Sequence, residues 1–336
     1  MRALVSHGPG LDHLSLDERE TPRPGPGQVL LRMRAAAVTL RDHKMAAGAY
    51  GAEDRAPLIL GGEGVGEIVE CGQDMAAWRI GQRVNPLFVQ GWTGDRVHAV
   101  DVATTTLGGP RLDGTFAQFM LASAASLVEV PAHLDDAEAA TLPFAGLTAW
   151  RAVQGVGPGD TVVVQGTGGI PLFALQFARL AGARVIVSSK SDEKLERARA
   201  LGAEHTFNYQ AQPDGHRTVL ELTAGRGADR VLDPGGSVTI AQSLRALRPG
   251  GTASVFNALG SADIEVSLPW LLGHNLRVLG VNAGSLAAHR AMAAAIGESG
   301  LRPVLECVLP FEAAADAVAA APRREQFGKV CLQMTA

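Results

Sequence analysis

The sequence predicts an α/β protein of two domains, one of which contains a doubly wound parallel sheet. At 336 residues the chain is long enough for two domains. Its character changes near residue 125, from turn-rich and β-rich to helices that alternate with short apolar strands. Because six such strands already complete the sheet, the last helices and strands are assigned back to the first part. The predicted domains are therefore 1–124 with 285–336, and 125–284.

The composition argues against a nucleic-acid or membrane role. Apolar residues make up 46% of the chain, charged residues 19%, and the net charge is −4, without a basic stripe that could follow a phosphate backbone. No apolar run approaches the ~20 residues that cross a bilayer, and the N-terminus looks like a strand rather than a signal peptide. Cys71, Cys307 and Cys331 lack disulfide or zinc spacing, which favours a reducing, cytoplasmic location.

The first domain is expected to be built mainly of strands. Residues 28–34 alternate in polarity after a turn of prolines and glycines, and a second strand is expected at 67–70 behind several glycines. Residues 90–115 have no clear period and are expected to form a long loop or lobe. The C-terminal part adds, in order, a helix at 287–296, a strand at 304–309, a helix at 311–320 and a strand at 329–332.

The second domain is expected to open with a capped helix at 135–142 and to alternate strands with helices from there. The strands are expected at 161–164, 184–190, 206–208, 230–232, 253–256 and 277–279. The helices between them are expected at 172–180, 191–201, 215–223, 239–247 and 269–273. This alternation is typical of a doubly wound parallel sheet of the Rossmann type.

A glycine-rich turn follows the first of these strands. A buried strand, a glycine turn and a helix form the arrangement that holds a pyrophosphate, because backbone N–H groups and the helix dipole favour the anion. Pro171 takes the third glycine position of the motif, and its ring fits the first turn of a helix. The residues expected to hold the pyrophosphate are Gly166, Thr167, Gly168, Gly169 and Ile170.

The end of the next strand bears on the choice between NAD(H) and NADP(H). A site for NAD(H) usually places an acidic residue there to bind the ribose hydroxyls, but this chain has Ser189 followed by Lys190, with Lys194 one turn later. A hydroxyl and ammonium groups suit a 2′-phosphate, so NADP(H) is the predicted cofactor. The alternative is an ordinary helix cap at 191–194 with solvated lysines.

Segments spread over the whole chain resemble the medium-chain dehydrogenase/reductase superfamily, of the alcohol dehydrogenase and quinone oxidoreductase type. The segments that carry the resemblance are GEGVGEIV (62–69), LPFAGLTAW (142–150), VQGTGG (164–169), DEKL (192–195), LGA (201–203), FNY (207–209), LRPGG (247–251) and FGKV (327–330). The resemblance implies a GroES-like β-barrel catalytic domain built from both chain ends, with a Rossmann domain inserted. It also implies a homodimer, for which the strand at 277–281 is a candidate edge.

The chain departs from the zinc enzymes of this family at their metal site. Where those enzymes typically carry a Cys, a His followed by Glu, and a later Cys or Asp, this chain has Thr39, Gly62 before Glu63, and Phe144. One carboxylate does not supply the three protein ligands of a catalytic zinc. The four cysteines of the family's structural zinc are also missing from residues 85–115. No metal is therefore expected.

The resemblance also implies roles for individual residues. Tyr209 is expected near the 2′-phosphate, and further cofactor contacts are expected from Thr148, Asn257, Val281, Asn282 and Lys329. For Tyr209 and Lys329 the alternatives are an ordinary strand-end tyrosine and a surface lysine. Thr39, Asp42 and Tyr50 match positions that face the substrate cleft in relatives without zinc, and they are the candidate catalytic residues, with plain barrel or surface residues as the alternative.

Loss of zinc favours substrates that delocalise negative charge themselves. Hydride addition to a quinone or an α,β-unsaturated carbonyl compound gives a phenolate-like anion or an enolate, which hydrogen-bond donors can stabilise. The predicted function is NADPH-dependent reduction of such a small carbonyl or quinone substrate. A zinc-free alcohol dehydrogenase is the alternative within the class. An NADPH-binding sensor or structural protein without turnover, and an enoyl reductase domain of a polyketide-type assembly, are the alternatives outside it.

Overall fold

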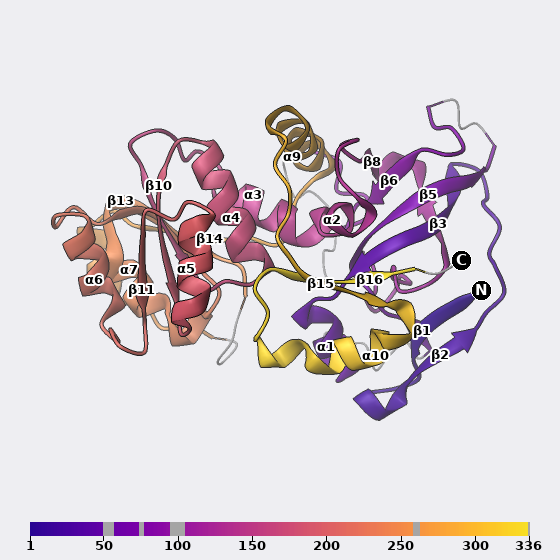
Figure 1. Cartoon of the computed structure of the whole chain (residues 1–336), viewed down its shortest axis with the longest axis horizontal. Helices are drawn as coiled ribbons and strands as arrows, with labels where there is room; N and C mark the ends of the chain where they lie inside the picture. Colours follow the sequence, from indigo (N-terminus) through magenta and orange to yellow (C-terminus); the bar gives the residue numbers. More distant parts are fainter. Residues whose placement is uncertain (50–56, 74–76, 95–104, 258–262, 335–336) are drawn as a thin grey trace. The chain divides into compact units, whose positions relative to one another are not determined.

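The computed structural model describes residues 1–49, 57–73, 77–94, 105–257 and 263–334. The chain forms two compact units, Met1–Leu147 with Ala283–Ala336, and Thr148–Asn282 (Figure 1). The first boundary lies at 147/148 rather than at the predicted 124/125, and the second lies at 282/283 rather than 284/285. The predicted α/β class is confirmed, and the first unit consists of two separate stretches of the chain.

The first unit contains two sheets in the part of the chain that is described. One has the order β2–β1–β4, and the other has the order β15–β16–β3–β5–β6–β8, with β7 paired to β3. The strands are β1 (Arg2–Ser6), β2 (Leu14–Glu18), β3 (Gln28–Ala37), β4 (Leu58–Ile59), β5 (Glu63–Cys71), β6 (Arg83–Pro86), β7 (Phe119–Ser123), β8 (Leu127–Glu129), β15 (Leu305–Pro310) and β16 (Lys329–Gln333). The helices are α1 (Leu40–Ala46), α2 (Asp136–Ala140), α9 (Leu286–Ser299) and α10 (Ala314–Ala320). The expected C-terminal helices and strands are thus confirmed.

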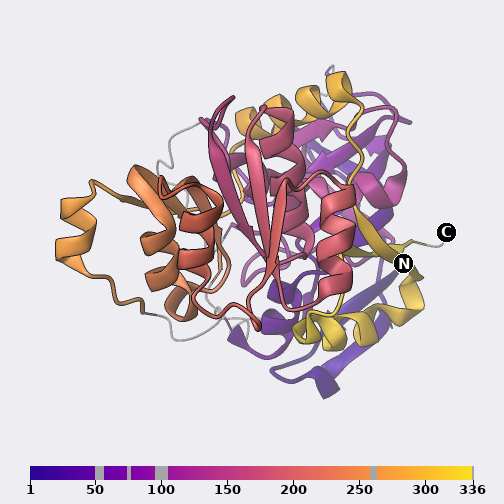
Figure 2. The same cartoon turned by 60° about the vertical axis from the view of Figure 1, so that its left-hand side comes forward.

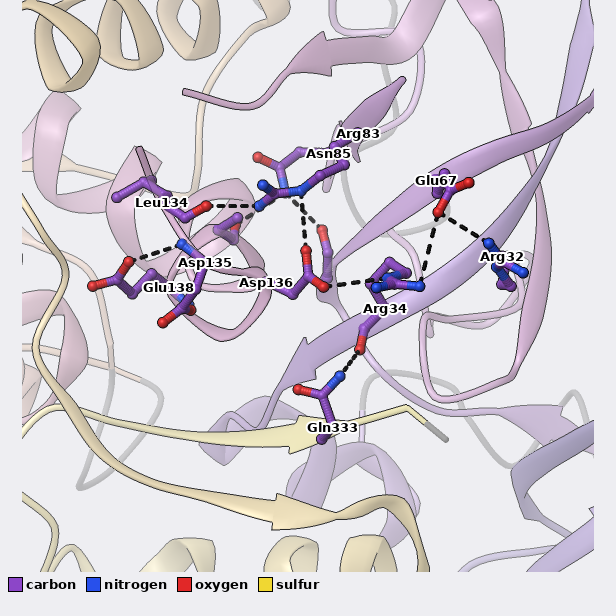
Figure 3. Close-up of polar contacts among 12 residues, drawn as sticks. Arg32, Arg34, Glu67, Arg83, Asn85, Leu134, Asp135, Asp136, Glu138 and Gln333 are labelled. Atoms are coloured by element: carbon purple, nitrogen blue, oxygen red, sulfur yellow. Dashed lines mark hydrogen bonds and ion pairs between the residues drawn. The ribbon is translucent and has the colours of Figure 1, made fainter. Parts of the chain in front are cut away.

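Helix α2 explains why the first boundary lies later than predicted. Its start is closed by a capping box, in which Asp135 and Glu138 each accept a hydrogen bond from the other's backbone N–H, at 2.8 and 3.0 Å. The Asp136 carboxylate then pairs with Arg34 on β3 at 3.2 Å and with Arg83 on β6 at 3.0 Å (Figure 3). These ion pairs join α2 to the strands of the first unit.

The second unit is a parallel sheet in the order β11–β10–β9–β12–β13–β14. In chain order this is 3-2-1-4-5-6, the strand order of the dinucleotide-binding Rossmann fold. The strands are β9 (Thr161–Gln165), β10 (Arg184–Ser189), β11 (His205–Asn208), β12 (Ala228–Asp233), β13 (Leu247–Val255) and β14 (Arg277–Gly280). The helices are α3 (Leu147–Ala152), α4 (Gly169–Leu180), α5 (Asp192–Ala200), α6 (Gly215–Leu222), α7 (Ile240–Ala246) and α8 (Leu268–Gly273). Figure 2 shows the rose helices α4 and α5 and the orange helices α6 and α7 flanking the strands from opposite sides.

A buried aspartate ties the amino ends of the central strands together. Asp229 on β12 accepts a hydrogen bond from the backbone N–H of Thr161 on β9 at 2.7 Å, and it is bound by Arg226 through two contacts of 2.8 Å and by Arg248. Burial alone would raise the pKa of Asp229, but these hydrogen bonds outweigh it and hold the pKa at about 2. The carboxylate therefore stays ionised and fixes the register of β9 against β12.

Two further expectations concern the whole chain. The three cysteines are free thiols, as their spacing predicted. Among the described residues, no helix has both the length and the apolar character needed to cross a membrane.

Helix α9 contains a histidine without polar partners. His289 is fully buried, and both of its ring nitrogens lack a hydrogen-bond partner in the described chain. Burial disfavours the imidazolium form and lowers the pKa of His289 to about 3. The folded protein therefore holds this ring neutral, whereas the unfolded chain protonates it at an ordinary pKa near 6.5.

Substitution His289→Leu is expected to flatten the dependence of stability on acid pH. Because the folded pKa is lowered, the wild type loses stability as the pH falls from about 6.5 towards 3, and the loss amounts to about 2 kcal/mol at pH 5. Urea unfolding of the wild type and the variant at pH 8 and pH 5 measures this loss of stability. At pH 8 the ring is neutral in both the folded and the unfolded state, so the difference in the free energy of unfolding between the two proteins there reports only the change in packing. Equal losses in both proteins between pH 8 and pH 5 would contradict a neutral buried ring.

Candidate cofactor and substrate site

The predicted cofactor residues of the second unit gather mostly at one edge of its sheet. The glycine turn follows β9, Ser189 ends β10, Tyr209 follows β11, Asn257 lies beyond β13, and Val281 and Asn282 follow β14. Because the strands are parallel, their carboxyl ends share this edge, and ligands of such sheets bind where the strand order reverses. Here the order reverses between β9 and β12. Thr148 lies instead in α3, where it is buried.

The glycine turn has an open backbone. Gly166 adopts φ +90°, a conformation that side chains disfavour, and its N–H donates to the Ser188 carbonyl at 2.7 Å. Gly168 precedes α4 without a side-chain cap, and no heavy atom of the described chain lies within 4 Å of the place where its Cβ would stand. The first N–H groups of α4 are thus not covered by a capping side chain, as an anion site requires.

The residues expected around a 2′-phosphate lie on neighbouring segments. The backbone N–H of Tyr209 donates to the Ser189 carbonyl at 3.1 Å, and Ser191 caps α5 by accepting the N–H of Lys194 at 3.3 Å. Lys190 and Tyr209 are exposed, and Ser189 is buried. The helix cap at Ser191 is therefore confirmed, and the contacts to a 2′-phosphate stay a prediction.

The sequence reasoning missed a polar network at the same edge. Gln165, the last residue of β9, donates to Ser243 on α7 at 2.9 Å, and Ser243 donates to Asp233 at the end of β12 at 2.6 Å. The sequence signal was present, since Asp233 follows the apolar pair Val231 and Leu232 and precedes a Pro-Gly-Gly turn at 234–236. An aspartate in that setting commonly binds the backbone N–H groups of the next turn.

A buried ion pair forms the centre of the first unit's polar cluster. The Lys329 ammonium contacts Glu63 and also donates to the Val38 carbonyl at 2.9 Å, and both charged side chains are almost fully buried. The other oxygen of Glu63 accepts the backbone N–H groups of Ala145 at 2.9 Å and Phe144 at 3.2 Å. Burial raises the pKa of Glu63, and Lys329 opposes that rise. The lysine is thus not the surface residue considered as an alternative.

Two of the three catalytic candidates form a cap of α1. The Thr39 hydroxyl donates to Asp42 Oδ2 at 2.7 Å and accepts the N–H of Asp42 at 3.2 Å. Asp42 Oδ1 is buried without a hydrogen-bond partner in the described residues, and burial raises the pKa of Asp42. Tyr50 lies outside the described residues. The donor of Thr39 is therefore already used, whereas Asp42 retains an acceptor.

Aromatic rings lie beside Gly62, one of the positions that match the zinc ligands of the family's metal enzymes. Phe88 stands where a side chain at Gly62 would project, since a Cβ there would lie 2.9 Å from the Phe88 ring. Phe144 packs on Phe88 with ring centroids 4.6 Å apart, and the Arg41 guanidinium lies 5.2 Å from the Phe88 centroid.

The residues present do not fit a catalytic zinc. In the part of the chain that the structure describes, no three His, Cys, Asp or Glu side chains converge as metal ligands. Glu63, the carboxylate at the matching position, is compensated by Lys329.

The chain matches two family models and many known proteins. The models are described as the alcohol dehydrogenase GroES-like domain, over residues 25–132, and zinc-binding dehydrogenase, over residues 169–299. The chain is 36% identical to a zinc-type alcohol dehydrogenase-like protein of Schizosaccharomyces pombe, over 97% of this chain and 96% of the relative. It is 34% identical to a 2-haloacrylate reductase of a Burkholderia species, over 78% and 75% of the two chains.

Solved structures agree with these matches. The structure of an NAD-dependent alcohol dehydrogenase is similar with a TM-score of 0.89 and 32% identity, over 100% of both chains. The first unit is thus a GroES-like domain, the second is a Rossmann domain, and the relatives are nicotinamide-dependent oxidoreductases. The chain belongs to the medium-chain dehydrogenase/reductase superfamily and is an NAD(P)-dependent oxidoreductase.

Proposed function

We propose that the protein transfers hydride from NADPH to a quinone or an α,β-unsaturated carbonyl compound without zinc. The observation that carries this proposal is the filled space beside Gly62, where an added side chain would meet the Phe88 ring. Phe144 packs on Phe88, and Glu63 is paired with Lys329. Without a Lewis acid, substrates whose product anion is delocalised react more readily than simple alcohols. The similarity to a 2-haloacrylate reductase supports this class, because an acrylate carries a conjugated double bond.

Each unit contributes its own part of the proposed reaction. The bound cofactor supplies the hydride. The glycine turn after β9 binds its pyrophosphate, and Ser189, Lys190, Lys194 and Tyr209 surround the 2′-phosphate. In the first unit Asp42 is the proposed proton-handling residue, because its Oδ1 is buried and unpartnered in the described chain whereas the Thr39 hydroxyl is already used. Tyr50 remains a proposed substrate contact.

A zinc-free alcohol dehydrogenase is the second candidate. The names of several relatives, including alcohol dehydrogenases of a Moraxella species and of Geobacillus stearothermophilus, favour it. The two functions share the cofactor and differ in the acceptor, so one assay distinguishes them. An NADPH-binding protein without turnover would bind the cofactor and reduce neither kind of acceptor.

We also propose a homodimer in a reducing, cytoplasmic compartment, with the free cysteines supporting the location. Strand β14 is the edge of its sheet, and all of its residues are exposed. Val278 and Leu279 are apolar residues of this edge. Leu272 of α8 is also exposed, with 67% of its surface accessible to solvent. An apolar edge strand, with no further strand beside it in the described chain, is a template for pairing with a second copy about a two-fold axis.

Purified protein is expected to oxidise NADPH when quinones or enones are supplied, and not when simple ketones or aldehydes are. The absorbance of the reduced nicotinamide measures the rate, and NADH is expected to be the poorer donor. Removal of metals with a strong chelator should leave the rate unchanged. Reduction of aldehydes alone, or loss of activity that added zinc restores, would contradict the proposal.

Substitution Gly62→Ala is expected to lower the free energy of unfolding by about 1–3 kcal/mol, because the new methyl group collides with Phe88. In a Phe88→Ala background the same change should cost much less, since the ring is gone. Urea unfolding of the four proteins measures the coupling. Gly157→Ala is the control, because its Cβ meets no atom within 4 Å. An equal cost of Gly62→Ala in both backgrounds would show that Phe88 does not fill this space.

Substitution Val278→Lys is expected to convert a dimer into a monomer in light scattering, because it places a charge on the β14 edge. Val308→Lys is the matched control. Val308 lies on β15, the edge strand of the larger sheet of the first unit, and is 45% exposed, against 40% for Val278. A monomeric wild type, or equal dissociation by both variants, would rule out β14 as the interface.

A further inference from the structure

The hydrogen bonds around Gln165 fix the orientation of its amide. Asp233 accepts hydrogen bonds from Gly235 N–H at 2.8 Å, Gly236 N–H at 2.9 Å, the Thr239 hydroxyl at 2.6 Å and the Ser243 hydroxyl at 2.6 Å. Because the Ser243 hydroxyl donates its one hydrogen to Asp233, its oxygen can only accept a hydrogen bond from Gln165. The Gln165 group that faces Ser243 at 2.9 Å must therefore be the NH₂ group.

The carbonyl of Gln165 is left without a donor from the described part of the chain. Its Oε1 is shielded from solvent and has no hydrogen-bond partner among the described residues. Native structures leave few buried acceptors unpaired, because desolvation without a hydrogen bond costs free energy. The network prevents the amide from turning to relieve this, since a turn would place two acceptors, Oε1 and the Ser243 oxygen, against each other.

The position of Gln165 indicates which ligand could supply the donor. Gln165 is the last residue of β9 and directly precedes Gly166 of the glycine turn, and the network runs from it to the end of β12. Ser189 and Tyr209, expected at the adenosine phosphate, lie on the opposite side of β9, at β10 and β11. The part of a dinucleotide that extends past the turn towards β12 is its nicotinamide half, which carries ribose hydroxyls as donors.

We propose that Gln165 is a cofactor-positioning residue, whose side-chain carbonyl accepts a hydrogen bond from a ribose hydroxyl of the nicotinamide half. Ser243 and Asp233 hold the amide in the required orientation. This assignment rests on the proposed function as far as the protein binds NADPH. It adds that Gln165, at the end of β9, contacts the nicotinamide half of the cofactor and not the adenosine half.

Binding of NADPH and of 2′,5′-ADP, which lacks the nicotinamide half, tests the assignment. Gln165→Met keeps the length of the side chain and removes the acceptor, so it is expected to weaken NADPH binding about tenfold and to leave 2′,5′-ADP binding unchanged. Ser243→Ala frees the amide to turn and should act in the same direction but less strongly. Thr206→Val is the control, because it removes a buried hydroxyl without a partner from β11 of the same sheet. Titration calorimetry measures the affinities, and thermal unfolding verifies that each variant is folded.

Three results would overturn the assignment. Wild-type affinity of Gln165→Met for NADPH would show that the carbonyl makes no contact. Equal losses for NADPH and 2′,5′-ADP would show that Gln165 only shapes the glycine turn. A wild type that binds neither compound would overturn the cofactor proposal itself, together with this assignment.

Discussion

The ion pair between Lys329 and Glu63 is the interaction on which the first unit depends. It joins β16 to β5, and the same two side chains also bind the carbonyl of Val38 and the backbone N–H groups of Phe144 and Ala145. Four segments that are distant in the sequence thus meet at two buried charges. Removal of one partner from such a pair typically costs about 3–5 kcal/mol, because the other charge stays buried without compensation.

The same ion pair leaves the Glu63 carboxylate poorly suited to bind a metal ion. A carboxylate that is already neutralised by an ammonium group offers little to a divalent cation, and the neighbouring rings of Phe88 and Phe144 provide no donor atoms. The Arg41 guanidinium lies over the Phe88 ring. Together with Lys329 it supplies positive charge from side chains in this region. The chemistry proposed for the protein follows from this change, since protein donors rather than a Lewis acid must then stabilise the product anion.

The second unit was predictable because its signals are local. Most of its strands contain a short apolar run, and Gly166 marks the turn after β9 by sequence alone. The first unit was less predictable because its contacts are non-local. Residues 135–142 were correctly predicted as a capped helix, but only non-local contacts, such as the pairing of Asp136 with Arg34 and Arg83, assign this helix to the first unit. Likewise, no local pattern indicates that Lys329 reaches Glu63 or that Phe88 fills the space beside Gly62.

The pairing of β16 with β3 has a consequence for the synthesis of the chain. Residues 35–37 of β3 pair with 331–333 of β16, so this edge of β3 stays open on a ribosome until residues 331–333 have been made. The Rossmann unit, by contrast, lies in one continuous segment and is complete long before. A nascent chain therefore carries a finished nucleotide-binding unit beside an unfinished barrel whose open alanine edge can pair with other chains. Deletion of β16 would leave this edge of β3 open permanently.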